Sequence, residues 1–170
     1  SGIETKDWSD MKNDAELLNS PSWTIGNYGN AIQLNGINQY VNVTNPILPS
    51  GDVAKTITLF VNMTNDCDDT DCNFGGFGIN TVGNNFQVGT SLIGTIFVWG
   101  WGSDWNTGYP NAEISDGQWH HISVAYDTTN TVFYVDGIQR ATTNSYSWDT
   151  DPQRLVIGNE IDYGGQEFNG

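Results

Sequence analysis

The stretch that most constrains the fold is residues 113–137, which reads EISDGQWHHISVAYDTTNTVFYVDG. Residues 119–126 alternate bulky and small side chains, and residues 131–135 are again β-branched and aromatic, as is typical of strands. Turn-forming residues separate the two runs, and Asp136-Gly137 favours a tight turn after the second. The stretch therefore predicts two strands joined by a turn.

The rest of the chain carries the same kind of signal. Its 170 residues suffice for one domain with a buried core, and seven Trp, seven Tyr and seven Phe supply bulky core side chains. Short alternating apolar runs separated by turn residues predict an all-β sandwich. Further strands are expected at 15–18, within 30–43 around Asn35-Gly36, and at 55–63, 94–101 and 154–157, with loops at 102–110 and 139–151.

The charge balance limits the possible partners. Five basic residues against twenty acidic ones give a net charge of −15, which repels nucleic acid and anionic membrane surfaces. The acidity is consistent with solubility in a salty or crowded setting, or with binding of a cation such as calcium. The sequence contains no run of eighteen apolar residues that would span a membrane.

The motif DGQWHHISVAYD…FYVDG resembles the signature of laminin-G-like and pentraxin-like domains of the concanavalin A-like lectin/glucanase superfamily. Residues 23–43, 97–108 and 154–170 resemble other segments of that family. The resemblance implies a two-sheet antiparallel jelly-roll β-sandwich spanning residues 1–170 as a single domain that lacks the family's first and last strands. It also implies that His120 and His121 are structural, and consecutive strand residues cannot jointly chelate one ion because they point to opposite faces.

The segment 65–73 is the most unusual local sequence. Cys67 and Cys72 are close enough to form a disulfide, which is the default pairing in an exported protein. Crowded carboxylates surround them, and two interpretations stay open: a solvated acidic hairpin tip, or a Ca²⁺ loop. The predicted metal ligands of the second interpretation are Asp66, Asp68 and Asp71.

The expected loop at 102–110 mixes aromatic and polar residues in the way that sugar sites do. Aromatic rings stack on the apolar face of a sugar, while Asp and Asn bond to paired hydroxyls. The resemblance places Trp99 and Trp101 among structural aromatics, so they are expected in the core. The predicted carbohydrate-binding residues are therefore Trp105, Tyr109, Asp104 and Asn106, followed by Tyr146 and Trp148.

An enzymatic interpretation is weaker. Glycoside hydrolases of this superfamily use Glu-x-Asp followed by a second Glu, which Glu160-Ile-Asp162 resembles, but positions 164 and 165 are Gly. We therefore expect no catalytic residues. Asn42 and Asn62 begin N-glycosylation sequons, which would matter in a glycosylating source.

The function predicted from the sequence is a non-catalytic, extracellular glycan-binding or adhesion module assisted by calcium. Its expected partner is a glycan or glycoprotein, without nucleic acid or membrane insertion. The alternative is a structural interaction module of a surface fibre, adhesin or virion, since an open sheet edge can accept a neighbour's strand. A glycoside hydrolase or lyase comes third.

Overall fold

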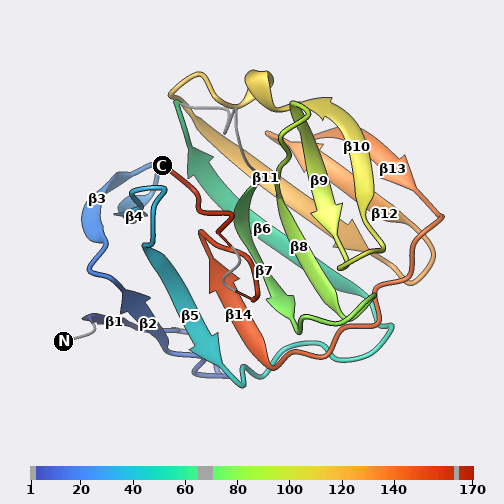
Figure 1. The fold of residues 1–170 in the computed structure, drawn as a ribbon, viewed down its shortest axis with the longest axis horizontal. Coiled ribbons are helices and arrows are strands. Elements are labelled where there is room, and N and C mark those ends of the chain that lie inside the picture. Colours follow the sequence, from blue (N-terminus) through green and yellow to red (C-terminus); the bar gives the residue numbers. More distant parts are fainter. Residues whose placement is uncertain (1–2, 65–70, 163–164) are drawn as a thin grey trace.

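Two antiparallel β-sheets pack face to face in the computed structural model, which describes residues 3–64, 71–162 and 165–170 (Figure 1). One sheet has eight strands, the other has four, and a separate two-stranded hairpin lies beside them. Within the described residues the only helical element is a short 3-10 turn, η1 (Asn111–Glu113), and no helix has the length and apolar character to cross a membrane. The predicted all-β sandwich is confirmed.

The eight-stranded sheet gathers strands from both ends and the middle of the chain. Its order is β1-β2-β5-β14-β7-β8-β9-β10, so β14 from the C-terminal part lies between β5 and β7. Each neighbouring pair is antiparallel. The bounds are β1 (Ile3–Thr5), β2 (Ala15–Leu18), β5 (Tyr40–Thr44), β14 (Arg154–Ile157), β7 (Cys72–Gly78), β8 (Asn85–Thr90), β9 (Thr95–Trp99) and β10 (Trp105–Pro110).

The four-stranded sheet is built on the predicted hairpin. Its order is β13-β12-β11-β6, with β11 (Trp119–Tyr126) paired to β12 (Thr131–Val135) on one side and to β6 (Lys55–Asn62) on the other. The outer strand is β13 (Ile138–Thr143). The separate hairpin consists of β3 (Ser22–Gly26) and β4 (Gly29–Gln33), which pair with each other and with no other strand among the described residues.

Two segments predicted as loops are strands. β10 occupies most of 102–110, and β13 occupies the start of 139–151. In β10 the buried Trp105 is opposite the buried Val98 of β9, so burial of a single large residue anchors a strand that is otherwise polar. The side chains of β13 are mostly polar and exposed, so its sequence lacks the alternation of apolar and polar residues that predicts a strand. An edge strand needs few apolar residues because few of its side chains face the core.

The core between the sheets is dominated by aromatic side chains. Trp148 is fully buried against Phe86, with ring centroids 5.3 Å apart, and its Nε1 donates to Thr131 Oγ1 at 2.8 Å. Phe86 comes from the large sheet and Thr131 from the small one, so Trp148 bridges the two layers. A buried indole needs such a hydrogen-bond acceptor, because an unpaired N–H would cost stability.

A buried lysine ties the 148–150 segment to the small sheet. Lys55 begins β6 and is 4% exposed, and its Nζ donates to Trp148 O at 2.5 Å, to Thr150 Oγ1 at 2.8 Å and to Gly51 O at 2.7 Å. Burial lowers the pKa of the amine to about 8, against the opposing influence of Asp52 and Asp149. The ammonium is thus desolvated but fully occupied by acceptors.

We predict that Lys55→Met lowers the free energy of unfolding by about 2–4 kcal/mol, because the acceptors that Lys55 now satisfies would be left buried without a donor. Urea unfolding at pH 7 measures the change. Lys12→Met is the matched control, since Lys12 is exposed, and it should leave the midpoint in place. Equal stability of the two variants would contradict the anchoring role of Lys55.

The two histidines of the hairpin have separate partners, as expected from their positions on opposite faces of a strand. His120 bonds through Nδ1 to Asp136 Oδ2 at 2.9 Å and through Nε2 to Asp116 Oδ1 at 3.2 Å. His121 Nε2 lies 2.6 Å from Thr58 Oγ1 of β6. Burial lowers the pKa of His120, but the two carboxylates together outweigh it and raise the pKa above 6.5.

This raised pKa predicts a pH-dependent stability. The protonated His120 stabilises the folded chain, so the contribution is fully present below pH 6.5 and is lost as the pH rises through the higher pKa of the folded state. The urea midpoint of the wild type should therefore fall as the pH rises above 6.5. His120→Gln should flatten this part of the curve, and an unchanged slope in that variant would refute the assignment.

Candidate functional site

The strands of the eight-stranded sheet expose a distinct set of side chains on the face that points away from the four-stranded sheet, here called the outer face. In β8, Phe86 and Val88 enter the core, so Gln87 lies on the outer face. In β9, Ile96 and Val98 enter the core, and Phe97 and Trp99 lie on the outer face. The pairing register places these residues beside one another across the sheet.

Glycines give these side chains room to lie flat on the sheet. A Cβ atom on Gly76 would lie 2.5 Å from Gln87 Cγ, and a Cβ atom on Gly89 would lie 2.8 Å from Trp99 Cζ3. Any side chain at either position would therefore displace its neighbour. The Cγ atom of Gln87 thus lies beside Gly76 of β7, and the indole of Trp99 lies beside Gly89 of β8.

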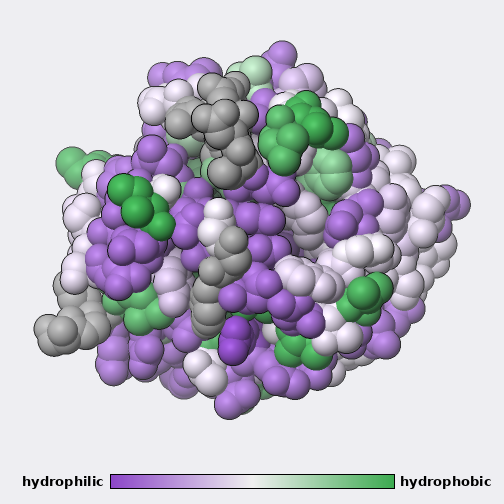
Figure 2. All heavy atoms as spheres, viewed as in Figure 1, coloured by the Kyte–Doolittle hydropathy of each residue, from purple (hydrophilic) through white to green (hydrophobic). Residues whose placement is uncertain are grey.

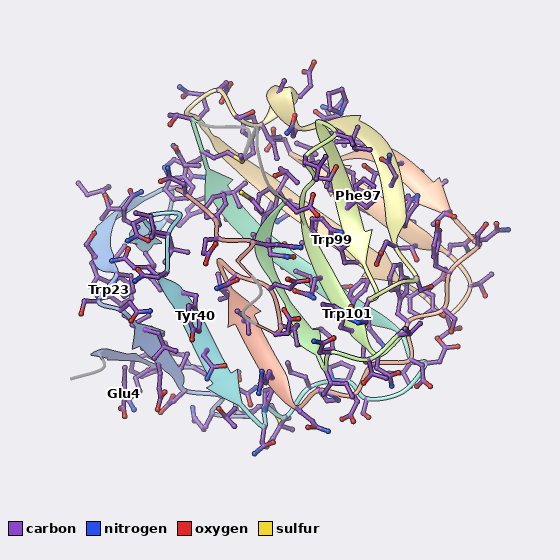
Figure 3. All side chains as sticks on the ribbon, in the orientation of Figure 1. Glu4, Trp23, Tyr40, Phe97, Trp99 and Trp101 are labelled. Carbon is purple, nitrogen blue, oxygen red and sulfur yellow. The ribbon has the colours of Figure 1, made fainter. Side chains whose placement is uncertain are left out.

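Aromatic rings form a platform along β9. Phe97 and Trp99 stack with centroids 5.7 Å apart and an interplanar angle of 24°. Trp101 follows in the turn after the strand, and Figure 3 shows the three side chains in line along β9 on the viewed face. All three are half-buried and lie outside the main core, so the expectation that Trp99 and Trp101 are core residues was wrong.

Residues 158–162 and 165–167 lie on the same face, in front of β14 and β7 (Figure 1). The ends of this segment are held by backbone hydrogen bonds from Gly158 N to Phe74 O and from Asn73 N to Gln166 O, each of 3.0 Å. In between, Ile161 O accepts from Arg154 Nη1 at 3.1 Å. The segment therefore brings its polar side chains to within reach of β7 and β8.

Several buried amide atoms on the outer face have no hydrogen-bond partner within the described part of the chain. They are Asn85 Oδ1 and Nδ2, Gln87 Oε1 and Asn73 Oδ1. Asn85 is 0% exposed and Gln87 is 1% exposed. A buried amide without a partner costs about 1–3 kcal/mol, so a group of them on one face calls for an explanation beyond folding.

Carboxylates gather at the same place. Glu160 is half-buried, and burial, followed by the nearby Asp162, Asp71 and Asp104, raises its pKa from 4.5 to about 7. Asp162 Oδ2 accepts from Asn80 Nδ2 at 2.7 Å. The cluster concentrates negative charge where water is partly excluded, and its carboxylate oxygens can accept hydrogen bonds. Figure 2 shows that this face as a whole is mostly hydrophilic.

Two of the residues predicted for carbohydrate binding lie at this site. Asp104 is exposed, and its Oδ1 accepts from Gly100 N at 3.0 Å, which fixes the turn that carries Trp101. Asn106 pairs with Phe97 and is exposed on the same face, where its Oδ1 accepts from Gly108 N at 2.8 Å.

The other four predicted aromatic contacts lie elsewhere. Trp105 and Trp148 are buried between the sheets at 6% and 0% exposure, so neither ring can receive a sugar in this structure. Tyr109 packs on Phe133 with Arg140 over its ring at 5.3 Å. Tyr146 stacks on Trp148 with centroids 5.7 Å apart.

The structure tests the remaining predicted sites only in part. Asp66, Asp68 and Cys67 lie outside the described residues, so the calcium loop and the pairing with Cys72 stay predictions. Asp71 Oδ1 accepts from Leu92 N at 2.8 Å, and no group of three metal-binding side chains occurs among the residues that are described. For the sequons, Asn42 is buried at 8% exposure, and Asn62 Nδ2 donates to Gly117 O at 2.9 Å.

Sequence reasoning missed Gln87 and Asn85 and set aside Glu160 and Asp162. The signal that could have found the amides is the glycine-rich run GGFG beside NNFQVG, since paired strands of small and polar residues leave room for a ligand. The outer position of Trp99 follows from alternation with Ile96 and Val98 in β9.

Comparisons with known proteins agree with this architecture. A family model described as the concanavalin A-like lectin/glucanases superfamily, with the label of a laminin G group, matches residues 35–170. No curated protein sequence matches the chain.

Solved structures with the same fold are similar at low sequence identity. The binding domain of Paraclostridial Mosquitocidal Protein 1 matches 92% of the chain with a TM-score of 0.71 and 17% identity, and the chain covers 42% of that protein chain. Domain 4 of AbnA, an extracellular arabinanase from Geobacillus stearothermophilus solved with arabinotriose, matches 92% with a TM-score of 0.61 and 16% identity, and 72% of it is covered. Mouse laminin α1 domains LG4-5 match 81% with a TM-score of 0.56 and 16% identity, and 36% is covered.

The charge cluster generates a prediction about ionisation. Asp162→Asn should lower the pKa of Glu160 from about 7 towards its ordinary value, because one neighbouring negative charge is removed. Titration of the Glu160 carboxyl carbon by NMR measures this, with Asp10→Asn as an exposed control. In the wild type the unfolding free energy should fall as the pH rises from 4.5 through 7, because Glu160 ionises more readily in the unfolded chain. An identical titration in both variants would contradict the cluster.

Proposed function

Because the chain belongs to the concanavalin A-like lectin/glucanase superfamily, in its laminin G group, we propose that it is a non-catalytic module that binds glycans on the outer face of its eight-stranded sheet. The observation that carries the proposal is the aromatic platform of Phe97, Trp99 and Trp101 beside buried amide atoms that have no hydrogen-bond partner among the described residues. The resemblance noted in the sequence holds for four-fifths of the chain, and it agrees with the fold.

The platform supplies the apolar half of a sugar site. A pyranose or furanose ring has one face of C–H groups, which packs on an aromatic face. Trp99 is held flat by Gly89 and by its stack on Phe97, so its ring is ordered before a ligand arrives. A rigid platform reduces the entropy that binding would otherwise lose.

The polar half of the site comes from the carboxylates and amides around the platform. Asp104 and Asn106 lie on the β9–β10 side, while Glu160 and Asp162 lie on the segment that crosses β7. Carboxylate oxygens accept hydrogen bonds from sugar hydroxyls, and amides both donate and accept. Gln87 lies between the two groups, next to Trp99 in the strand register. A ligand that displaced the atoms now burying Gln87 would donate a hydrogen bond to its Oε1, which has no partner among the described residues.

Binding is favoured over catalysis by the placement of the acidic pair. Glu160 and Asp162 lie on the irregular segment after β14 and not on a strand, so alternation does not align them as nucleophile and acid. Similar structures include a domain described as a binding domain and a domain solved with arabinotriose. We accordingly assign no catalytic residue.

We propose further that calcium assists binding and that the module acts outside the cell. Burial first, and then the neighbouring Asp162, Asp71 and Asp104, raise the pKa of Glu160, and a divalent cation would relieve the repulsion between these carboxylates. The net charge of −15 and the similarity to a domain of an extracellular arabinanase support an extracellular setting.

The decisive experiment combines a glycan array with a matched pair of tryptophan variants. The array is run in calcium and in a chelator, and calorimetry measures the affinity for the strongest glycan. Trp99→Ala should weaken that affinity at least tenfold, which corresponds to about 1.4 kcal/mol. Trp8→Ala removes a tryptophan that is 88% exposed at the N-terminal part of the chain, and it should bind as the wild type does.

The outcomes separate the parts of the proposal. Glycan binding that a chelator abolishes supports the role of calcium. Glycan binding that persists in the chelator contradicts the role of calcium but still supports the glycan site. If Trp99→Ala and Trp8→Ala bind equally, the site does not lie on the outer face. A blank array from folded protein would sink the proposed function itself.

A further inference from the structure

The strand register sets one row of residues across the outer face of the eight-stranded sheet. From β2 to β9 the row runs through Glu16, Asn42, Val156, Gly76, Gln87 and Trp99. Glu16 is exposed on one side of this face, Gln87 and Trp99 lie on the other, and Gly76 contributes no side chain. The row fixes where the charged, amide and aromatic groups of the face lie relative to one another.

Glu160 lies in front of the middle of β7. Its carboxyl group interacts with the charges of Asp162, Asp71 and Asp104. Asp71 directly precedes β7, whereas Asn80, just beyond the other end of β7, donates from Nδ2 to Asp162 Oδ2 at 2.7 Å. Because Glu160 interacts with acids at both ends of the strand, it lies between those ends, where β7 pairs with the part of β8 that contains Gln87.

The polar groups gathered here are short of hydrogen-bond donors. Within the described residues, the buried amide oxygens of this face that have no partner are Gln87 Oε1, Asn85 Oδ1 and Asn73 Oδ1. Asn85 Nδ2 is an amide nitrogen in the same state. Ionised carboxylates, such as those of Glu160 and Asp162, add further acceptors and no donors. A ligand that suits this set of groups therefore brings donors.

Positive charge is scarce on the same face. Four of the five Lys and Arg residues belong to other parts of the molecule, namely Lys6, Lys12, Lys55 and Arg140. The fifth, Arg154, lies on the outer face by alternation with Val156, and its Nη1 donates to Ile161 O at 3.1 Å. The charges that act most on Glu160 are negative. An anionic ligand would be repelled at this place, and a cation would be attracted.

We propose that the outer face selects glycans that carry a protonated amine, as unacetylated amino sugars do, over neutral and anionic glycans. This inference rests on the proposed glycan-binding function, which it makes more specific. The ammonium group donates to the carboxylates of Glu160 and Asp162, and to Gln87 Oε1 once the ligand displaces the atoms that bury it.

The aromatic platform suits the same ligand. Trp99 lies on β9, two strands or about 10 Å from β7, so an oligosaccharide reaches both the indole and the carboxylates. The C–H face of one sugar ring packs on Trp99 while an amine on the same or the next ring meets Glu160. The π face of a tryptophan also attracts a cation, which adds to the preference for an amine.

The test compares one glycan in two forms, a glucosamine tetramer and the same tetramer with every amine acetylated. Acetylation removes the charge and leaves the rings and hydroxyl groups in place. Calorimetry is run at about pH 6.5 in about 0.15 M salt, which screens attraction beyond about 8 Å. The free-amine tetramer should bind at least tenfold more tightly than the acetylated one, in calcium and in a chelator alike. Sialyllactose, which is anionic, should show no measurable binding.

Two glutamate variants locate the selection for charge. Glu160→Gln should weaken binding of the free-amine tetramer at least tenfold and abolish the preference between the two tetramers. Folding should not suffer, because the variant removes the repulsion between Glu160 and Asp162. Glu16→Gln is the matched control, since it makes the same charge change at an exposed position on the same face, three strands from β7. It should bind both tetramers as the wild type does.

The results separate this inference from the proposed function. Equal binding of the two tetramers, or tighter binding of the acetylated one or of sialyllactose, would support the glycan site but overturn selection for an amine. Equal losses in Glu160→Gln and Glu16→Gln would assign the preference to the overall charge of the chain and overturn its placement on the outer face. Folded protein that binds no glycan at all would overturn the proposed function and this inference together.

Discussion

The outer face depends on the absence of side chains along part of β7 and β8. Gly76, Gly78 and Gly89 leave the sheet bare where Gln87, Asn85 and Trp99 lie down on it, and a Cβ atom at any of them would meet a neighbour at contact distances that side chains do not tolerate. Glycine in a strand interior costs stability, because it packs nothing and loses more backbone entropy. Glycine at three neighbouring positions lowers the stability of the sheet, but it leaves space for side chains or a ligand to lie close to the backbone.

Electrostatics on that face follow from the same geometry. Backbone hydrogen bonds hold Gly158 on Phe74 and Gln166 on Asn73, so the chain is anchored to β7 on either side of Glu160 and Asp162. Burial and like charge therefore raise the pKa of Glu160 to about 7, which means that its charge depends on pH in the neutral range. A ligand or cation that binds the ionised form of Glu160 more tightly would shift its ionisation towards the carboxylate. Binding of such a ligand would therefore be linked to proton release.

The sequence predicted the sandwich and most of its strands, because alternation in 119–126 and 55–62 is strong and the turns between strands are clear. It predicted the site only in part. The mixture of Trp, Tyr, Asp and Asn at 102–110 indicated a sugar loop, but Trp105 is the residue that buries β10 against β9. Composition does not reveal which member of such a mixture faces inward. That depends on the register with Val98. The contacts of Gly158 and Gln166 with β7 are long-range contacts that no local pattern encodes.

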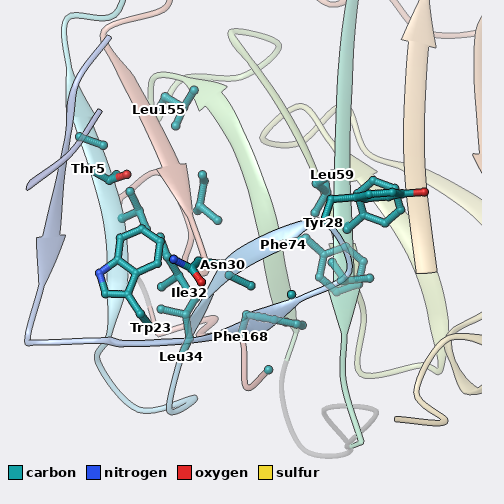
Figure 4. A pocket seen from close by; sticks show the side chains of 18 of the residues that line it. Thr5, Trp23, Tyr28, Asn30, Ile32, Leu34, Leu59, Phe74, Leu155 and Phe168 are labelled. Carbon is teal, nitrogen blue, oxygen red and sulfur yellow. The ribbon is translucent and has the colours of Figure 1, made fainter. Parts of the chain in front are cut away.

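Strand β14 contributes side chains to both faces of the eight-stranded sheet. Its four residues alternate, so that Leu155 and Ile157 line the inner cavity beside β6 and β4 (Figure 4), while Val156 lies on the outer face, opposite Gly76 and Asn42. Because β14 also bonds to both β5 and β7, it cannot shift towards one surface without breaking register on the other. A substitution at Ile157 can reach the outer face only through this rigid ladder. The two surfaces are therefore separable by side-chain changes on β14, although they are built on the same backbone.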